Sequence, residues 1–199
     1  MIITRLYLIR HGETEENQRG ILAGSTDVPL NGNGRSQSMA LAKLARTLPV
    51  DVIFASPLQR AVETAILAFG KEARIITDSS LREFHFGEWE GLHFSDIAKR
   101  YPELWKTWVH DWEHTNIPGA EAFTAFAQRV ISFSTGLLHS HQGQNLAIVS
   151  HGGWIRALLA HLFSGSAGTG YWKFKVENAT VTEVEFAGDL PILTRFNHR

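Results

Sequence analysis

Three short apolar runs, each followed by polar residues, constrain the fold of this chain most strongly. They are Leu6–Ile9, Val52–Ala55 and Leu146–Val149, and each is rich in branched side chains and precedes a stretch of helical character. Short runs of this kind indicate strands that are buried on both faces, as in a parallel sheet. Ligands of such sheets bind in the crevice beyond the carboxyl ends of the strands. The residues that directly follow the runs are therefore expected to meet at one edge of one sheet.

Two arginines and two histidines occupy these positions. Arg10 and His11 follow the first run, Arg60 follows the second, and His151 follows the third. A guanidinium is a rigid fork that binds two phosphate oxygens at once, so a lysine would not be equivalent. A neutral imidazole can accept a phosphoryl group, and nearby cations favour the neutral ring because they oppose its protonation. Together the four side chains predict a binding site for a phosphate dianion.

The ordered set of motifs resembles the histidine phosphatase superfamily, also called phosphoglycerate mutase-like. The hallmark of that family is an Arg-His-Gly motif that ends the first strand, with a second histidine near the end of the chain. The resemblance runs from Leu6 to about Leu162, and its further segments are Asn17, Ser56-x-x-x-Arg60, Leu81-x-Glu83-x-x-Phe86-Gly87-x-Trp89-Glu90-Gly91, Gly119-x-Glu121 and Ser150-His151-Gly152. One departure is Gly119-Ala120-Glu121-Ala122, where the family more often has Gly-Gly-Glu-Ser.

The resemblance implies a role for each site residue. His11 would be the nucleophile, and Glu83 the general acid that protonates the leaving oxygen, which contributes ~10²–10⁴-fold in rate. The expected phosphate ligands are Arg10, Asn17, Arg60, His151 and Gly152. Arg10, Arg60 and His151 would also act in catalysis, because they hold the charge of the transferring phosphoryl group. Since these groups meet that charge, we expect no metal and no other cofactor.

Rival residues for these roles are few. Glu88 and Glu90 lie close to Glu83 in sequence and are weaker candidates for the acid. His110 and His114 are four residues apart and could bind zinc in principle, but a third ligand is not evident, and an exposed pair is favoured. The chain has no Gly-rich P-loop motif.

An aromatic segment, from about residue 84 to 118, is expected to form an irregular lid over the site. It holds four of the six tryptophans. Trp105, Trp108 and Trp112 share one helical face by their spacing. Two interpretations remain: these side chains pack on the core, or they wall the crevice beside Glu83. An aromatic wall would suit a substrate with a planar base better than a small sugar acid.

The remaining pattern predicts an α/β fold. Asn31 is expected to cap a helix over 35–48, and Ser56 a second helix with Pro57 at its first position. Further helices are expected over 94–100, from 102, and over 121–139 and 154–163. The ranges 172–177 and 180–186, with 192–196 after them, alternate apolar and polar residues and predict an antiparallel hairpin at the edge of the sheet. We therefore expect a single domain over 1–199, a three-layer α/β/α sandwich with a mostly parallel central sheet and an antiparallel edge.

Composition narrows the class of protein. Of 199 residues, 44% are hydrophobic and 20% are charged, so the chain can bury a sizeable core. The formal net charge of −1 leaves no basic surface for nucleic acid, and the absence of cysteine excludes disulfides and thiolate chemistry. No apolar stretch approaches the ~18 residues of a membrane span. We expect a cytoplasmic protein whose partner is a small phosphate ester, with a homodimer left open.

The expected activity is a metal-independent phosphomonoesterase that works through a phosphohistidine. Within the superfamily, the chain is most similar to the bacterial alpha-ribazole phosphatases of cobalamin biosynthesis. That similarity lies in its short length and in Phe86-Gly87-Glu88-Trp89-Glu90 and Trp108-x-x-Asp111-Trp112 before Ile117-Pro118. The alternatives are a phosphoglycerate mutase-type phosphotransferase, a broad-specificity sugar or nucleotide phosphatase, and a non-catalytic phosphate-binding module. Loss of His11 or Glu83 would favour the last, and both residues are present.

Overall fold

A six-stranded sheet forms the centre of the protein in the computed structural model, which describes residues 2–199. The strand order is β3-β2-β4-β1-β5-β6. The first four strands in this order are mutually parallel, whereas β5 is antiparallel to β1 and to β6. The bounds are β1 Ile3–Arg10, β2 Val52–Ala55, β3 Ile75–Thr77, β4 Asn145–Ser150, β5 Val181–Ala187 and β6 Leu190–His198. The expected α/β class and antiparallel edge are confirmed.

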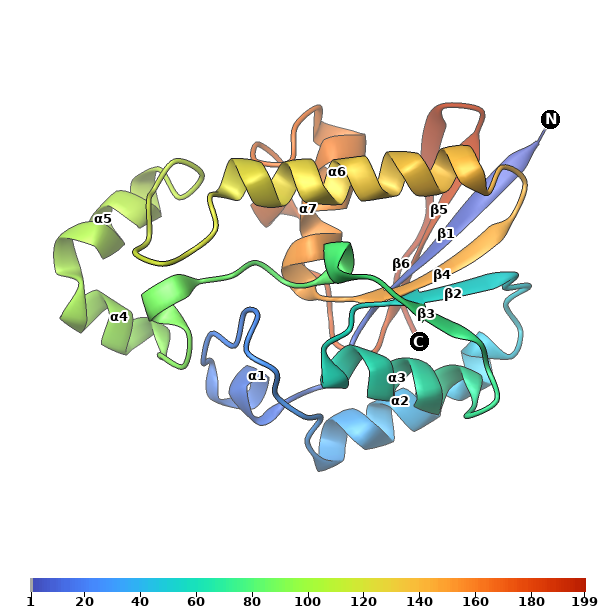
Figure 1. The fold of residues 1–199 in the computed structure, drawn as a ribbon, viewed down its shortest axis with the longest axis horizontal. Helices are drawn as coiled ribbons and strands as arrows, with labels where there is room; N and C mark the ends of the chain where they lie inside the picture. The colour runs from blue at the N-terminus through green and yellow to red at the C-terminus, as the bar shows by residue number, and fades with distance from the viewer. Residues whose placement is uncertain (1) are drawn as a thin grey trace.

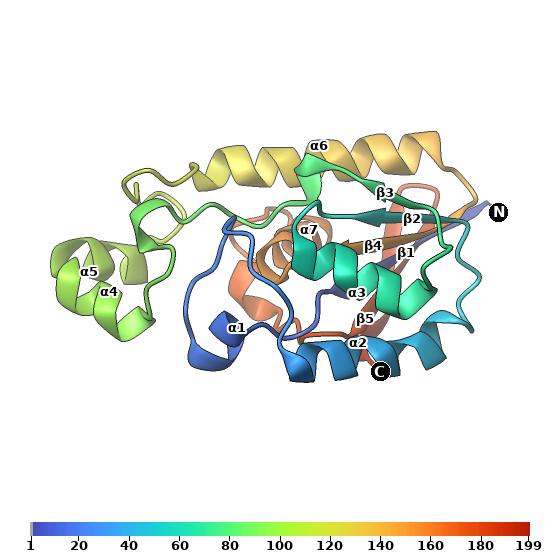
Figure 2. The same cartoon turned by 60° about the horizontal axis from the view of Figure 1, so that its bottom comes forward.

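Helices cover both faces of this sheet (Figures 1 and 2). They are α1 Glu15–Arg19, α2 Gly32–Ala45, α3 Gln59–Phe69, α4 Phe94–Arg100, α5 Pro102–His110, α6 Phe123–Ser140 and α7 Gly152–Ser164, with 3₁₀ turns η1 Ser79–Leu81, η2 Gly87–Trp89 and η3 Tyr171–Lys173. Successive residues of β1 alternate between the layers: Leu6 and Leu8 pack with α6 and α7, while Tyr7 and Ile9 pack with α2 and α3. The three-layer sandwich is therefore confirmed.

The segment that carries α4 and α5 projects beyond one end of the sheet (Figure 1). It has its own apolar cluster around the buried side chains of Trp89, Ile97 and Ile117. The first of these helices spans the expected residues, and α5 begins at Pro102 as expected. Leu22 bonds through its backbone to Leu92, which joins this segment to the loop after α1. The projecting segment and that loop together border the carboxyl ends of the strands.

Two sequence expectations about local structure are wrong. The helix after β2 begins at Gln59 with Leu58 as its N-cap, and Ser56 does not cap it. Asp27 instead accepts a hydrogen bond from the Gln59 N–H at 2.8 Å, so that helix end is satisfied from the loop after α1. Asn31 caps its helix as expected, but that helix ends at Ala45, three residues before the expected end. A Cβ atom at Gly34 would lie 2.0 Å from the Glu13 carbonyl oxygen, which explains why glycine stands inside this helix.

The expected hairpin is misassigned as well. Residues 172–177 form the end of η3 and irregular chain, and the antiparallel pair is β5 with β6. The residues between, Asn178 and Ala179, do not form a hairpin turn. The Ala179 N–H donates to the carbonyls of Arg10 (3.0 Å) and His11 (3.3 Å), and the Asn178 amide donates to the His11 carbonyl (3.0 Å). This segment therefore holds the end of β1. Among residues 2–199, we find no helix that combines the length and apolar character of a membrane span.

Candidate active site

The carboxyl ends of β1, β2 and β4 place the predicted residues around one cavity. Arg10 pairs with Ser150, and Ala55 pairs with Val149, so the residues that follow these strands are neighbours. The cavity has a volume of about 500 Å³. Six predicted site residues line it: Arg10, His11, Asn17, Arg60, Glu83 and Gly152. The seventh, His151, is fully buried beside them, with its ring centroid 5.1 Å from that of His11.

His11 is buried and held in one tautomer. Its Nδ1 lies 2.6 Å from the Gly12 carbonyl oxygen, which can only accept, so Nδ1 carries the proton. The Nε2 atom is left with its lone pair, and the Arg60 Nε lies 3.3 Å away. Burial, followed by the positive charges of Arg60 and Arg10, lowers the pKa of His11 well below its ordinary value. The ring is therefore neutral near pH 7, the form that can attack phosphorus.

Arg10 and Arg60 line the same cavity as the ring of His11. Arg60 is held by two loop carbonyls, those of Thr26 (Nη1, 2.8 Å) and Gly24 (Nη2, 2.6 Å). Arg10 donates from Nη1 to the Val176 carbonyl at 2.7 Å. Burial lowers the pKa of Arg10 to about 10, so it stays charged at neutral pH. The two cations are thus fixed before any ligand binds, which is the preorganisation that phosphoryl transfer requires.

His151 is oriented by the serine that was expected to cap a helix. Its Nε2 lies 2.8 Å from the Ser56 Oγ, and the same oxygen accepts from the Leu58 N–H at 3.4 Å. Burial, followed by the charge of Arg60, lowers the pKa of His151 well below its ordinary value. When the Ser56 hydroxyl donates to Nε2, the proton of the neutral ring is on Nδ1.

Two of the predicted site residues each have a polar atom that is buried without a hydrogen-bond partner among residues 2–199: Arg10 Nε and His151 Nδ1. Arg156 Nε and Glu16 Oε2, on other residues that line the cavity, are buried and unpaired as well. Buried polar atoms are almost always paired, because an unmade hydrogen bond costs about 1–3 kcal/mol. Arg10 and His151 surround His11 Nε2. An anion bound in the cavity would account for the unpaired atoms of these two residues.

Glu83 lines the cavity, and its carboxylate is bound by backbone N–H groups of its own segment and of the start of α7. Its Oε2 accepts from the Gly153 N–H at 2.8 Å, and its Oε1 accepts from the Phe84 N–H at 2.9 Å. The Gly153 N–H is therefore bound to Glu83 and does not point freely into the cavity as an anion donor. A Cβ atom at residue 153 would lie 2.2 Å from Glu83 Oε1, so only glycine fits here.

Asn17 is fixed by contacts to its amide oxygen. The Thr14 N–H donates to Oδ1 (3.3 Å) within the capping box of α1, and Asn178 Nδ2 donates to it at 3.1 Å. These contacts leave the Asn17 amide nitrogen as the group that can donate to a ligand. Asn178 also lines the cavity and was missed by sequence reasoning, because an Asn-Ala pair between two alternating segments resembles a hairpin turn.

The two rival carboxylates have other roles. Glu90 accepts hydrogen bonds from the backbone of Ser25 (2.9 Å), Thr26 (2.9 Å) and Phe86 (3.2 Å). It thereby holds the loop whose carbonyls bind Arg60. Glu88 accepts from the Tyr101 hydroxyl at 3.1 Å. Neither residue lines the cavity that contains His11.

The aromatic residues divide between core and cavity. Trp89 is fully buried, and Trp105 packs against both Trp89 and Trp108, with ring centroids 6.0 and 5.2 Å away. Trp112 lies beyond the end of α5 and packs against Tyr171, 4.7 Å between centroids. The aromatic residues that line the cavity are Phe86, Phe94, Trp108, Tyr171 and Trp172. Of the three tryptophans expected to share a helix face, only Trp108 faces the cavity.

Besides Asn178, the cavity side chains that were not found from sequence include Tyr171, Trp172 and Arg156. Arg156 lies over the ring of Trp172, with its guanidinium carbon 5.3 Å from the centroid. Trp172 is 54% exposed and was assigned to a strand by its alternating neighbours. Arg156 lies five residues after His151 on α7, and this spacing along a helix that starts at the site is the signal that could have found it.

The histidine pair considered for zinc lies at the surface. His114 Nδ1 is 2.7 Å from Asp111 Oδ1, and His110 is exposed at the end of α5. Over residues 2–199 the structure groups no three His, Asp, Glu or Cys side chains as metal ligands.

Comparison with known proteins places this site in a family. The profile of the histidine phosphatase superfamily (branch 1) matches residues 6–199. The chain therefore belongs to the histidine phosphatase superfamily, and the class of reaction is the hydrolysis of phosphoric monoesters.

Three relatives illustrate the range of the family. An adenosylcobalamin/alpha-ribazole phosphatase from Salmonella typhimurium is 35% identical over 196 residues, which cover 98% of this chain and 96% of the relative. The crystal structure of an alpha-ribazole phosphatase from Shigella flexneri has a TM-score of 0.88 at 34% identity, covering 97% and 96% of the two chains. A phosphoserine phosphatase from Entamoeba histolytica, solved with 3-phosphoglyceric acid, has a TM-score of 0.87 at 29% identity, covering 98% of each.

Proposed function

We propose that this protein is a metal-independent phosphatase that hydrolyses alpha-ribazole 5′-phosphate through a phosphohistidine at His11. The observation that carries the proposal is the state of His11: a neutral ring, with Nδ1 bound to the Gly12 carbonyl and Nε2 directed at Arg60 in the cavity. The two relatives named above as alpha-ribazole phosphatases support the choice of substrate.

The reaction has two steps. In the first, His11 Nε2 attacks phosphorus, the ester P–O bond breaks, and Glu83 gives its proton to the leaving oxygen. In the second, the Glu83 carboxylate takes a proton from water, the oxygen of that water attacks phosphorus, and the P–N bond breaks to release phosphate. Arg10, Arg60 and His151 hold the phosphoryl oxygens throughout, and the amide nitrogen of Asn17 and the backbone of Gly152 complete the binding site.

The aromatic side of the cavity favours a planar leaving group. Trp108, Trp172 and Phe86 line the same cavity as His11, so a base attached to the ribose would lie among aromatic rings. Each aromatic contact contributes about 0.5–1.5 kcal/mol beyond apolar burial. Two contacts would therefore give a preference of about tenfold or more over a small acid, at about 1.4 kcal/mol per decade.

A second candidate substrate is a small phosphorylated acid such as phosphoserine. Arg156 supports it, because it supplies a third arginine to the cavity and could bind a carboxylate. The Entamoeba relative carries that activity in its name. The Arg156 guanidinium, however, is stacked on Trp172. The planar base of a substrate can extend that stack, whereas a small acid cannot.

Steady-state kinetics with a substrate panel tests this proposal. We expect kcat/KM to be highest for alpha-ribazole 5′-phosphate and lowest for phosphoserine and 3-phosphoglycerate, with phosphate released to water and with no loss of rate in excess EDTA. Trp108→Ala and Trp172→Ala should reduce the preference, and Trp105→Ala, outside the cavity, is the matched control. Equal kcat/KM for both classes of substrate would exclude the alpha-ribazole assignment, and transfer of phosphate to a second substrate would favour a mutase.

The domain organisation, the cellular location and the partners of the protein are also part of the proposal. We propose one domain over residues 1–199 that acts in the cytoplasm on a small phosphate ester, with no nucleic-acid partner. The formal net charge of −1 and the absence of cysteine support these statements. A homodimer stays an open alternative.

A further inference from the structure

We infer that the ion pair between Arg129 and Glu121 positions Glu83 for its role as the general acid. The inference rests on the proposed function, because it takes Glu83 to be the acid. Neither Arg129 nor Glu121 lines the cavity that contains His11, so they act on Glu83 through the backbone that carries it. We therefore describe them as positioning residues.

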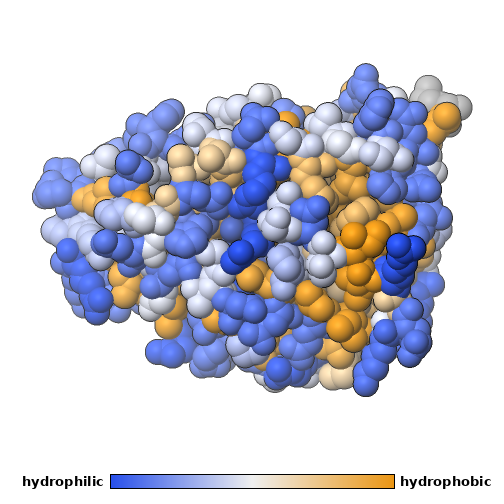
Figure 3. Space-filling view, viewed as in Figure 1, coloured by the Kyte–Doolittle hydropathy of each residue, from blue (hydrophilic) through white to orange (hydrophobic). Residues whose placement is uncertain are grey.

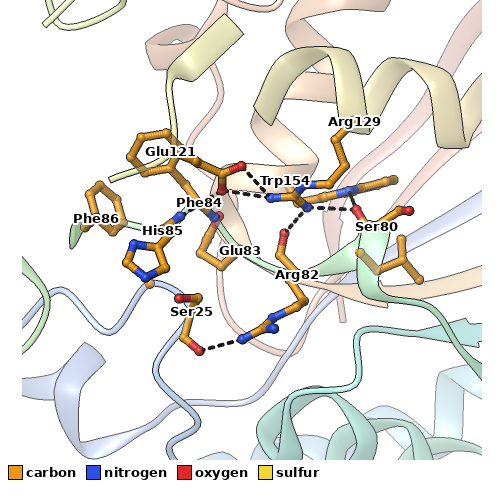
Figure 4. Close-up of polar contacts among 12 residues, drawn as sticks. Ser25, Ser80, Arg82, Glu83, Phe84, His85, Phe86, Glu121, Arg129 and Trp154 are labelled. Atoms are coloured by element: carbon orange, nitrogen blue, oxygen red, sulfur yellow. Dashed lines mark hydrogen bonds and ion pairs between the residues drawn. The ribbon is translucent and has the colours of Figure 1, made fainter. Parts of the chain in front are cut away.

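Arg129 holds the chain directly before Glu83. From α6 its Nη1 donates to the Ser80 carbonyl (2.9 Å) and to the Arg82 carbonyl (2.8 Å), and Figure 4 shows these contacts. The Arg82 carbonyl belongs to the peptide bond that leads into Glu83. A single guanidinium thus fixes the backbone on the N-terminal side of the acid.

Glu121 holds the chain directly after Glu83. Its Oε1 accepts from the His85 N–H at 2.9 Å, and its own N–H donates to the His85 carbonyl at 3.1 Å. The same carboxylate binds Arg129 Nη2, at 2.8 Å through Oε1 and 3.2 Å through Oε2. The ion pair therefore closes a clamp on both sides of Glu83, at positions 82 and 85.

The clamp restrains the segment of Glu83 on a side where that segment borders a hollow. Arg82, Glu83 and His85 border a second hollow of about 530 Å³, which Arg129 and Glu121 also line. Figure 3 shows this face, where a band of hydrophilic residues crosses the middle of the molecule below α6. On the side of the hollow, directed hydrogen bonds restrain the segment. On its other side, Phe84 packs against Phe126 of α6, with ring centroids 5.4 Å apart.

The clamp also fixes the distance between Glu83 and its partner on α7. Glu83 Oε2 accepts from Gly153, at the start of α7, and α7 packs against α6, which carries Arg129. Arg129 thus ties the segment of Glu83 to the same layer that supplies Gly153 and His151. Losing the clamp would leave the carboxyl group present but displaced, and a displacement of about 1 Å can cost ~10²-fold in rate.

A dependence on the leaving group separates positioning from general damage to the site. An alkoxide needs a proton from Glu83 to leave, whereas p-nitrophenolate leaves without one. The parameter to measure is kcat/KM, because it reports only the steps up to departure of the leaving group. We compare p-nitrophenyl phosphate with an alkyl phosphate in wild type, Glu83→Gln, Arg129→Met, Arg129→Lys and Glu121→Ala, with Arg35→Met, which breaks the exposed Arg35–Glu63 pair, as the matched control.

The expected result is a loss confined to the alkyl ester. Glu83→Gln should lower its kcat/KM by ~10²–10⁴-fold. Arg129→Met and Glu121→Ala should lower it by about 10–100-fold, with p-nitrophenyl phosphate nearly unaffected. Arg129→Lys should not restore it, because an ammonium group cannot reproduce the fork. Retained turnover of p-nitrophenyl phosphate itself shows that a variant is folded. If Arg129→Met does not fold, the kcat/KM of Glu121→Ala for the alkyl ester tests the inference.

Two other outcomes would overturn different claims. If Glu83→Gln shows the leaving-group dependence but Arg129→Met and Glu121→Ala do not, the positioning inference is wrong and the acid role stands. If Glu83→Gln itself loses both substrates equally, the acid role in the proposed function fails, and the inference fails with it.

Discussion

Burial of two histidines beside two arginines is the main electrostatic feature at the scale of single residues. His11 and His151 are both buried, and the causes that lower their pKa values are first burial and then the charge of Arg60. A carboxylate beside either ring would work against the neutral form. Glu83 is instead directed at the Gly153 N–H. The proposed nucleophile and the proposed acid therefore have different backbone partners: His11 binds the Gly12 carbonyl, and Glu83 binds the Gly153 N–H.

These pKa shifts predict how stability depends on pH. The unfolded chain takes up protons on both histidines as pH falls below about 6.5, whereas the folded chain resists protonation, so the unfolded state binds more protons. The free energy of unfolding should therefore fall as pH decreases from about 6.5 to 5. The slope contributed by each histidine is about 1.4 kcal/mol per pH unit.

Urea denaturation at a series of pH values measures this slope. The variants His11→Asn and His151→Asn should each show a shallower slope than wild type, and the difference between variant and wild type cancels the exposed histidines. An identical slope in wild type and both variants would mean that the two rings are not held neutral by the fold.

At the scale of elements, the projecting segment of α4 and α5 depends on one tryptophan. Trp89 is fully buried in the cluster that includes Ile97 and Ile117, and Trp105 and Trp108 pack against its ring. This cluster is separate from the two that cover the central sheet. Trp89 therefore supports the shape of the cavity wall without touching the cavity itself.

Trp89→Ala should lower the free energy of unfolding by about 3–5 kcal/mol, as expected for removal of a buried tryptophan. Trp172→Ala, at a side chain that is 54% exposed, should cost far less stability and should instead reduce the preference for aromatic substrates. Urea midpoints and kcat/KM ratios for the two variants measure both effects. Equal losses of stability would contradict the division between core and cavity aromatics.

At the scale of the whole molecule, the sequence predicts the strand ends well and the segment over 172–179 poorly. Arg10, Arg60 and His151 could be placed together because parallel strands end at a common edge, and three short apolar runs identify those strands. Residues 172–177 alternate like a strand, but the chain there forms the end of η3 and irregular structure, and the residues that follow hold the end of β1.

Side-chain partners are the other part that the sequence could not supply. Ser56 precedes a helix and would be a good cap, but the N-cap is Leu58. The Ser56 hydroxyl instead lies 2.8 Å from His151 Nε2. Glu90 looks like Glu83 in sequence, yet the loop at Ser25 and Thr26 supplies its partners. Such choices depend on which segments meet in three dimensions, and no local pattern encodes them.

The central claim is that His11 carries the phosphoryl group during turnover, and trapping that intermediate tests it most directly. Labelled substrate is mixed with enzyme, and the reaction is quenched within the first turnover. The wild type should yield a phosphoprotein that is labile in acid and stable in base, as a phosphohistidine is, with the label on His11. His11→Ala should remain folded and yield neither label nor turnover. An acid-stable adduct, or substantial turnover by His11→Ala, would contradict the account.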